Sequence, residues 1–570
     1  MATKVCDRTK PEKAESCGTM TTQPEILVQD IDHLGIIAGI IDEMGLVEEI
    51  DRQLGTPQQQ QVSAGQVVKA MILNGLGFVS APLYLFEQFF VGKATEHLLG
   101  EGVGPEHLND DRLGRVLDKL HKAGLSQVFL KVTLEACKKF GVSTSRVHLD
   151  SSSFHVDGEY AIAIADPASR VQQQEDEAEP RPIHISYGYS RDHRPDLKQF
   201  VMDLICTGDG DVPLYLRLAD GNEADKAVFA QLMKEFQQQW TFEQVQVMVA
   251  DSALYSEDNL QSLGELPWIC RVPATLTQAK QLLQAGAELE WVASSLEGYR
   301  LAQQYSNYGG IEQRWLIVES QARKEADLKQ LDKRLNQNQE RANKQLQALS
   351  RQEFSCEPDA LKAAKQFERQ LKFHALEAIE VIERVHHEQA GRPRKDAQAT
   401  RVSYHLQATL VPKPTVIQAE VTCAGCFILA SNITDPQQLS NDEVLQEYKD
   451  QQSCERGFRF LKEPLFFTSS VFVKSPKRVA ALAMVMGLGL LVYSLGQRQL
   501  RQALLAAQQT IKNQLGKATQ TPTLRWVFQC FQAVHLLQLA GSKQVSNLSD
   551  ERKWILRFLE PTCRQYYLLC

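Results

Sequence analysis

A chain of 570 residues, 43% of them hydrophobic, is long enough for three or four domains that each bury a core. Its 12 cysteines are scattered, and its N-terminus lacks a basic start followed by an apolar stretch and a cleavage site. We therefore expect neither a disulfide framework nor secretion, and the sequence favours a large cytoplasmic protein.

Taken as a single number, the formal net charge of −8 argues against nucleic-acid binding, but the charge is unevenly distributed along the chain. From Arg456 to Cys570, 16 Lys and Arg residues stand against four acids, a local net charge of +12, which leaves −20 for residues 1–455. A phosphate-binding face toward the C-terminus would account for this bias. A basic helical surface without a partner is the alternative.

The first two segments differ in pattern. Residues 1–25 mix Thr, Lys, Glu and Pro without a period, which predicts a disordered tail. From 26 to 142, apolar residues recur three and four positions apart, and Gly, Pro and Ser separate the segments. This pattern predicts an all-helical N-terminal domain.

Short β-branched runs begin after Gly141. Strands are predicted over 146–150, 198–207, 212–220, 245–251 and 267–273, with helices over 222–238 and shortly after 251. Three strands, a helix, a strand, a helix and a strand follow one another in a ribonuclease H-like fold. Other α/β domains can produce the same order.

A polar segment over 291–425 interrupts this α/β pattern. Two long helices with leucines at heptad-like spacing are predicted between 320 and 387, broken near Cys356 to Pro358, and they suggest an antiparallel helical hairpin. Strand-like pieces over 311–320 and 401–411 flank the hairpin, so we expect a β-rich insertion that bears it. The basic turn over 391–395 is either a phosphate contact or a solvated loop.

Beyond the insertion, a strand over 426–432 leads to a helix from Asn441 to Glu463 that opens with a capping-box spacing. The apolar run from Val479 to Leu495 contains two glycines and has Lys and Arg on both sides, so we expect a buried core helix rather than a membrane span. Residues 511–570 are predicted to form a helical C-terminal region.

Two predicted strands end in a carboxylate. Asp150 follows the run over 146–149, and Asp251 follows the run over 245–250. Carboxylate oxygens suit hard divalent ions, and Mg²⁺ is commonly held by one or two carboxylates together with substrate phosphate. A strand that ends in Asp is common, so either residue alone is weak evidence, and the pair in this strand order is stronger.

The predicted helix from Asn441 to Glu463 adds a third carboxylate. Tyr448, Glu455 and Lys462 are seven residues apart, and seven steps of 100° fall about 20° short of two turns, so the three share one helix face. A metal-binding acid between an aromatic ring and a cation suits a nucleic-acid active site. A solvated surface row of charges is the alternative.

The segment Tyr448-x2-Gln451-x3-Glu455-x6-Lys462 resembles the Tyr-x2-Arg-x3-Glu-x6-Lys signature of DDE transposases in the insertion sequence four superfamily. The surrounding segments VHLDSSSFHVDGEY, MVADSALYS and CERGFRFLKEP are similar to the branch of that superfamily with a long helical N-terminal domain. The resemblance covers roughly residues 26–510. Gln451 stands where the signature has arginine, and an amide has no charge.

The resemblance implies a ribonuclease H-like catalytic core in two parts, over 143–290 and 426–510, interrupted by the insertion. It implies a catalytic and metal-binding triad of Asp150, Asp251 and Glu455 with two Mg²⁺ or Mn²⁺ ions. The enzyme would cut double-stranded DNA at transposon ends by hydrolysis and join the 3′-hydroxyl ends to target DNA by transesterification. A ribonuclease H-like nuclease without joining activity and an inactive DNA-binding relic are the alternatives.

The resemblance also implies partners and DNA contacts. We expect a homodimer that pairs terminal inverted repeats near the bacterial nucleoid, with the N-terminal domain binding ends or dimerising. Trp291 and Trp315 are candidates for stacking a flipped base, with core packing as the alternative for both. Arg456 and Arg459 are candidates to compensate for Gln451, although both lie on other helix faces. The candidate DNA contacts are Tyr448, Gln451, Arg459, Lys462, Lys474, Lys477 and Arg478.

Overall fold

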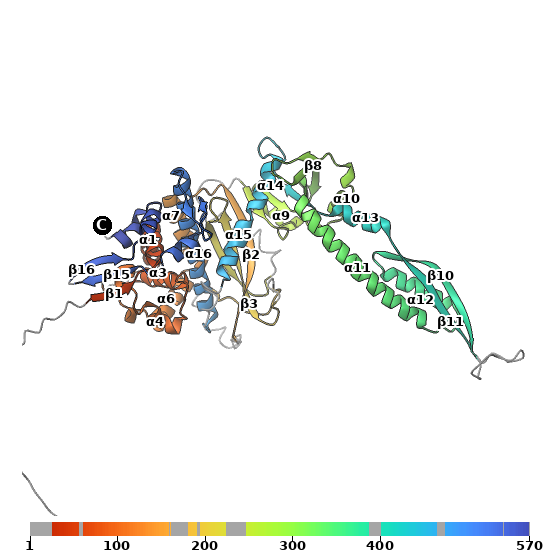
Figure 1. Ribbon diagram of the computed structural model, residues 1–570, viewed down its shortest axis with the longest axis horizontal. Coiled ribbons are helices and arrows are strands. Elements are labelled where there is room, and N and C mark those ends of the chain that lie inside the picture. Colours follow the sequence, from red (N-terminus) through yellow and green to blue (C-terminus); the bar gives the residue numbers. More distant parts are fainter. Residues whose placement is uncertain are drawn as a thin grey trace, which may run out of the picture. The chain divides into compact units, whose positions relative to one another are not determined.

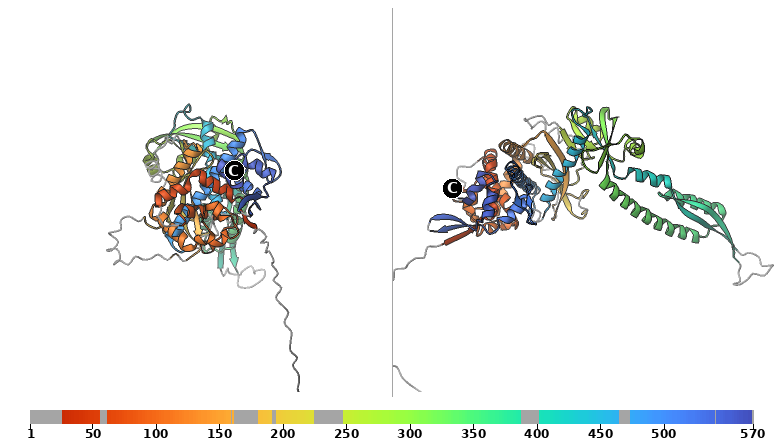
Figure 2. Two further views of the ribbon diagram at one scale, coloured as in Figure 1. Left: turned by 90° about the vertical axis from the view of Figure 1, so that its left-hand side faces the viewer. Right: turned by 45° about the horizontal axis from the view of Figure 1, so that its top comes forward.

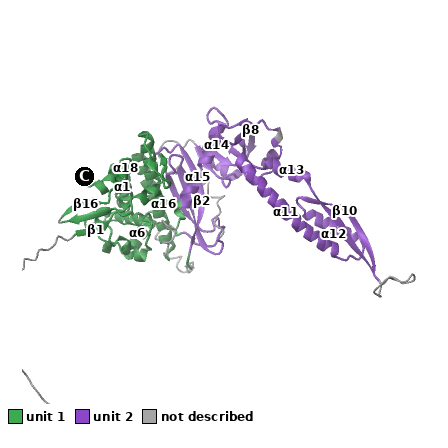
Figure 3. Ribbon diagram, viewed as in Figure 1, with its two compact units in different colours: residues 1–141, 157–182, 460–570 green, residues 142–156, 183–459 purple. Residues whose placement is uncertain are grey.

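The chain forms two compact units (Figure 3), one from residues 1–141, 157–182 and 460–570 and the other from 142–156 and 183–459. A computed structural model describes residues 26–55, 61–158, 160, 180–190, 194–223, 247–386, 401–463, 473–539 and 541–568. The predicted tail over 1–25, most of the predicted helix over 222–238 and the basic turn over 391–395 lie outside the described residues.

The first unit is mostly helical, in agreement with the prediction for its N-terminal part. Buried apolar side chains at helical spacing hold its helices together. The helices are α1 (Leu34–Met44), α2 (Leu46–Leu54), α3 (Ala64–Gly75), α4 (Phe86–Phe90), α5 (Thr95–Leu99), α6 (Asp110–Lys122), α7 (Leu125–Phe140), α16 (Pro476–Ala506), α17 (Leu524–Cys530), α18 (Asp550–Leu556) and α19 (Pro561–Leu568).

The long helix α16 is apolar on all sides because it is surrounded by α1, α3, α6, α7 and α17. Among the described residues it is the one helix long and apolar enough to cross a membrane, and 94% of its apolar stretch is buried inside the protein. The predicted buried core helix is therefore confirmed. We expected residues up to 510 to belong with the catalytic core, whereas α16 is part of the first unit.

The two ends of the chain pack together in the first unit. At Gly39 of α1, a Cβ atom would lie 2.4 Å from the Cα atom of Cys563 in α19, so only glycine permits this close approach. The strand β1 (Ile26–Asp30) pairs with β15 (His535–Leu539), which pairs with β16 (Ser542–Ser546). The C-terminal region, predicted as helical, contains α17, α18 and α19, but it also supplies β15 and β16, which the prediction missed.

The second unit is built on one nine-stranded mixed sheet (Figure 1), with the strand order β4-β3-β2-β5-β6-β12-β9-β8-β7. Two of the predicted strands, over 198–207 and 311–320, agree to the residue, whereas the strand that begins at 146 is longer than predicted and those over 292–293 and 299–308 were not predicted. The strands are β2 (Arg146–Val156), β3 (Lys198–Thr207), β4 (Pro213–Ala219), β5 (Val247–Ala250), β6 (Trp268–Arg271), β7 (Val292–Ala293), β8 (Tyr299–Tyr308), β9 (Ile311–Ser320) and β12 (Cys426–Ser431).

The first strand of this sheet in sequence, β2, lies between its antiparallel partner β3 and its parallel partner β5. β4 continues the sheet antiparallel to β3, and β6 continues it parallel to β5. In chain order these five strands therefore lie as third, second, first, fourth and fifth. The insertion strands extend the same sheet through β12, which is antiparallel to both β6 and β9.

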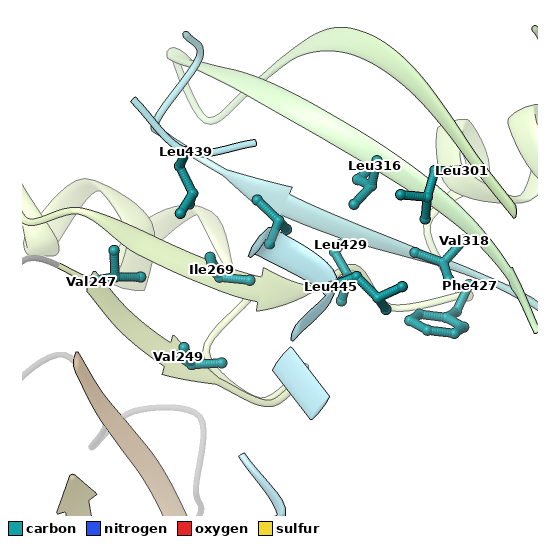
Figure 4. Packing of buried hydrophobic residues seen from close by; sticks show 11 residues of the cluster. Val247, Val249, Ile269, Leu301, Leu316, Val318, Phe427, Leu429, Leu439 and Leu445 are labelled. Carbon is teal, nitrogen blue, oxygen red and sulfur yellow. The ribbon is translucent and has the colours of Figure 1, made fainter. Parts of the chain in front are cut away.

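An apolar core packs beneath the middle of the sheet, where α14 (Asn441–Asp450) lies on β5 and β6. Figure 4 shows Leu445 of α14 among side chains of the sheet, including Val249, Ile269, Leu429 and Leu316. Each is at most 1% exposed. This packing fixes the start of α14, and with it the segment that carries the third carboxylate, against the parallel strands.

After β9, the insertion continues with the helix α11 (Gln321–Arg351), which runs from the end of β9 toward the ribbon of β10 (His374–His386) and β11 (Arg401–Pro412) (Figure 1). The second helix, α12 (Glu357–Gln370), ends well before 387, so the prediction of a helical hairpin is wrong beyond it. Both helices pack on the ribbon through a small core that includes Leu346, Phe367 and Leu406. A two-stranded ribbon needs this cover to bury one face.

Candidate functional site

Three acidic residues from distant parts of the sequence line one cavity of about 420 Å³ in the second unit. They are Asp150, Asp251 and Glu455, the acids singled out by the sequence. Asp150 and Asp251 are half-buried and Glu455 is exposed. The cavity is therefore open to solvent on the side of Glu455 and framed by the sheet on the side of the two aspartates.

The two aspartates come from neighbouring parallel strands. Leu149 of β2 stands opposite Ala250 of β5 in the strand register, and Asp150 and Asp251 are the next residues of each strand. Neighbouring strands lie about 4.8 Å apart, so the two carboxylates leave the sheet side by side. We expected Asp150 to end its strand, but β2 continues to Val156. Asp150 therefore has strand backbone on both sides, which holds it rigidly.

Hydrogen bonds fix both aspartates locally. The backbone N–H of Ser151 donates to Oδ1 of Asp150 at 2.8 Å, and the N–H of Ala253 donates to Oδ1 of Asp251 at the same distance. The Cys270 thiol in β6 donates to the backbone oxygen of Asp251 at 2.9 Å. Burial, and next the negative charge of Asp251, raise the pKa of Cys270 well above its usual value, which keeps this thiol protonated as a donor.

Glu455 lies on α15 (Gln452–Leu461), which is a separate helix from α14. The prediction of one continuous helix from Asn441 to Glu463 is wrong because the chain turns at Gln451. There the Gln451 amide donates to the carbonyl of Leu149 at 3.4 Å, and the Cys454 thiol donates to the carbonyl of His148 at 3.2 Å. These bonds hold the start of α15 against β2, beside Asp150.

The donor set of the cavity suits a hard divalent cation, because it offers carboxylate oxygens from three elements. Within the part of the chain that the structure describes, no three His, Cys, Asp or Glu side chains are close enough together to hold a metal ion by themselves. Mg²⁺ is usually held by one or two carboxylates completed by substrate oxygens, and Asp150 and Asp251 are the carboxylates of this lining that leave neighbouring strands.

Tyr448 lies between the acids and the core. Its ring centroid is 5.9 Å from that of Phe427, which also lines the cavity. Burial raises the pKa of the Tyr448 phenol, and the positive charge of Arg271, together with its hydrogen bond, opposes this shift only in part. The phenol therefore keeps its proton at neutral pH and can donate a hydrogen bond into the cavity.

Two cations that the sequence did not single out complete the lining. Lys449 holds its ammonium group 4.5 Å from the ring centroid of Tyr299 on β8. The guanidinium of Arg323, in the first turn of α11, lies 5.6 Å from the ring of Phe427. Lys449 directly follows Tyr448, and this adjacency was the available signal. Nothing in the sequence indicated Arg323, because 132 positions separate it from Glu455.

Of the remaining residues that the sequence singled out on the predicted helix over 441–463, only one lines the cavity. Gln451 lines the cavity, and Arg459 is exposed on α15. Lys462 follows the last residue of α15 and belongs to the first unit. Arg456 makes a bidentate ion pair with Asp211, with nitrogen to oxygen distances of 2.8 to 3.0 Å, so it cannot compensate for the missing arginine.

The predicted phosphate contacts at the start of α16 are in the first unit. Lys474 is exposed. Arg478 forms two hydrogen bonds to the carboxylate of Asp118 at 2.7 and 2.9 Å, and Lys477 lies 3.6 Å from the same carboxylate. The hydrogen bond from Arg478 is the main cause that lowers the pKa of Asp118. Lys477 and Arg478 are therefore engaged within the protein.

The two tryptophans proposed for base stacking have structural partners. Trp315 in β9 is 1% exposed, and its indole N–H lies 3.2 Å from the Tyr255 hydroxyl and 3.1 Å from Oε1 of Gln313. A base cannot reach this ring, so base stacking on Trp315 is wrong and core packing is correct. Trp291 is half-buried, donates to the carbonyl of Gly286 at 2.8 Å and is not part of the cavity lining.

Comparisons with known proteins give three findings. Residues 26–134 match a family model described as a domain of unknown function, DUF4277. No curated protein matches the sequence. A cryo-EM structure of the piggyBac transposase synaptic complex with hairpin DNA is similar, with a TM-score of 0.36 and 8% identity, over 94% of this chain and 80% of that chain. The site geometry, rather than these similarities, carries the functional argument.

Proposed function

We propose that this chain is a DNA transposase that cuts double-stranded DNA at transposon ends and joins the 3′-hydroxyl ends to target DNA, with divalent metal ions as cofactors. One observation carries the proposal. Asp150, Asp251 and Glu455 lie at intervals of 101 and 204 residues in the sequence, and all three line one cavity.

The strand arrangement supports a ribonuclease H-like catalytic core. Among the strands β4-β3-β2-β5-β6, β2 is in the middle, with the antiparallel β3 on one side, followed by β4, and the parallel β5 on the other, followed by β6. Asp150 lies on β2, and Asp251 follows β5, the parallel strand beside it. In such a core, function depends on the site rather than on the fold, and here the acids are at the junction of the two parallel strands.

We infer distinct roles for the cavity residues. Asp150 and Asp251, fixed on neighbouring strands, would be the first metal ligands, and Glu455 on α15 would join them when substrate and metal ions are bound. When bound, two Mg²⁺ or Mn²⁺ ions would stabilise charge on the attacking and leaving oxygens of a phosphodiester exchange. The same carboxylates can therefore serve hydrolysis by water and transesterification by a 3′-hydroxyl.

The remaining lining would bind the DNA strand. Lys449 offers positive charge to phosphate oxygens, and the protonated Tyr448 phenol offers a hydrogen bond. Arg323 would have to exchange its contact with Asp327, at 3.6 Å, for a phosphate. Gln451 offers an amide donor where the resembling family has an arginine. These groups would position a DNA strand for transfer. We also propose that a dimer pairs the two transposon ends.

A strand-transfer assay tests the proposal. Purified protein is incubated with Mg²⁺ and DNA that carries the ends of the element, and both cut and joined products are measured. We expect cutting and joining that chelation of the metal abolishes. Cutting without joined product would show a ribonuclease H-like nuclease, and the absence of any metal-dependent cutting would show a DNA-binding relic.

A further inference from the structure

The helix α11 presents one side to the protein and the opposite side to solvent. Leu331, Ala342 and Leu346 are its buried residues, and they lie on one side of the helix. The helix packs on β9, β11 and α13 (Pro414–Cys423). Ser320 caps the first turn by accepting a hydrogen bond from the N–H of Arg323 at 3.4 Å. The helix therefore starts at the cavity wall, since both residues line the cavity.

The solvent side of α11 carries a row of positive charges. At 100° per residue, five exposed cations of α11, together with Arg323, fall within an arc of about 120°, opposite the buried side. Glu340 is the one acid of α11 in that arc. We call the following five exposed residues the basic stripe: Lys329, Lys333, Arg341, Lys344 and Arg351.

The basic stripe has no ion-pair partner in the described part of the second unit. The other cations of α11 have partners: Lys324 pairs with Glu319, Arg334 with Glu420, and Arg323 with Asp327. Among the described residues, no carboxylate lies within 4.0 Å of a nitrogen of the basic stripe. An exposed row of cations without ion-pair partners among the described residues fits a partner with regularly spaced negative charge.

We propose that the basic stripe binds the phosphate backbone of duplex DNA that extends outward from the cavity. At 1.5 Å per residue, the stripe from Lys329 to Arg351 is about 33 Å long, close to one turn of the double helix at about 34 Å. Figure 2 shows the green helix α11 leading away from the sheet in the right-hand view. The inference rests on the proposed function, in which the cavity holds the scissile phosphate.

The test compares two variants with the same change in charge. K329Q/K333Q/K344Q removes three charges of the stripe, and K362Q/K365Q/R369Q removes three exposed charges of α12 in the same insertion. Glutamine keeps a helix propensity close to that of Lys and Arg, so both variants should fold, and circular dichroism verifies this. Fluorescence anisotropy then measures binding to a 40-base-pair duplex between 50 and 200 mM salt.

We expect the stripe variant to bind at least tenfold more weakly at about 0.1 M salt, and the slope of log K against log salt to fall in magnitude by about 2 to 3. The α12 variant should bind as the wild type does. Equal binding by the two variants would overturn the inference and leave an acidic protein surface as the competing occupant.

A cutting assay on the same duplex separates this inference from the proposed function. If the wild type cuts DNA with Mg²⁺ while both variants bind equally, the stripe inference fails and the proposed function stands. If the wild type does not cut but the stripe variant alone loses affinity, the proposed function fails and the DNA-binding stripe stands.

Discussion

The buried imidazole of His33 makes the stability of the first unit depend on pH. His33 is 2% exposed and lies between the rings of Phe78 and Phe528, with centroids 4.7 and 4.8 Å away. Its Nε2 lies 2.9 Å from the carbonyl of Leu76, and its Nδ1 lies 2.9 Å from the amide nitrogen of Gln532. The neutral ring satisfies both contacts, whereas a proton on Nδ1 would face a second donor.

Burial is the main cause that lowers the pKa of His33 to about 4 in the folded state, from 6.5 in an unfolded chain. As the pH falls through 6.5, the unfolded chain therefore takes up a proton first, and folding stability decreases until the pH approaches 4. From these two values, His33 should cost about 2 kcal/mol of stability at pH 5.0 and almost nothing at pH 7.5.

Urea unfolding at pH 7.5 and 5.0, followed by circular dichroism, measures this effect. His33→Gln keeps a donor and an acceptor but does not titrate, so its loss of stability between the two pH values should be about 2 kcal/mol smaller than that of the wild type. Gln532→Glu, at an exposed position, should also reduce the loss, because a carboxylate accepts from a protonated Nδ1. The same pH dependence in all three proteins would refute the reasoning.

Three further substitutions test the packing described above. Gly39→Ala should lower the free energy of unfolding by about 3 kcal/mol in urea titrations, because its Cβ atom would meet the backbone of Cys563 at 2.4 Å. Trp315→Phe should cost about 1 to 2 kcal/mol through its lost hydrogen bonds and leave DNA affinity in anisotropy assays unchanged. Arg478→Ala should lower the free energy of unfolding by at most about 1 kcal/mol, since its ion pair with Asp118 is partly exposed. A double-mutant cycle with Asp118→Ala should assign that loss to the interaction between the two side chains.

Matched changes control these three predictions. Gly286→Ala meets nothing closer than 3.6 Å and should leave stability unchanged, so equal effects at the two glycines would contradict the close-packing argument. A DNA affinity that falls with Trp315→Phe but not with Trp291→Phe would contradict the assignment of Trp315 to the core. A cycle with no coupling for Arg478, or a comparable loss in Lys474→Ala, would contradict the ion pair.

The strands of the second unit could be predicted because their apolar pattern is regular. Strands over 198–207 and 311–320 agree with β3 and β9 to the residue. β10 was predicted as helix for a physical reason. Its apolar residues also recur three and four apart, and a bulge at Ala378, with a φ of 48°, breaks the alternation by two that identifies a strand. Only the pairing with β11 decides between the two structures.

The candidate site could be predicted in part. Asp150, Asp251 and Glu455 were identified from strand ends and motif spacing, and the structure lines one cavity with them. Arg323 and Tyr299 could not be identified, because only the tertiary fold brings the insertion to the cavity wall. The break at Gln451 also escaped the helical pattern, since contacts with β2 rather than local propensity determine it.

The most direct test of the carboxylate triad is the cutting and joining of end-bearing DNA by Glu455→Gln in the presence of Mg²⁺. Asp450→Asn, an exposed acid outside the cavity lining, is the control with the same change in charge. We predict that Glu455→Gln abolishes both steps while it binds DNA as the wild type does, and that the control cuts and joins normally. Normal cutting by Glu455→Gln would contradict the proposed active site.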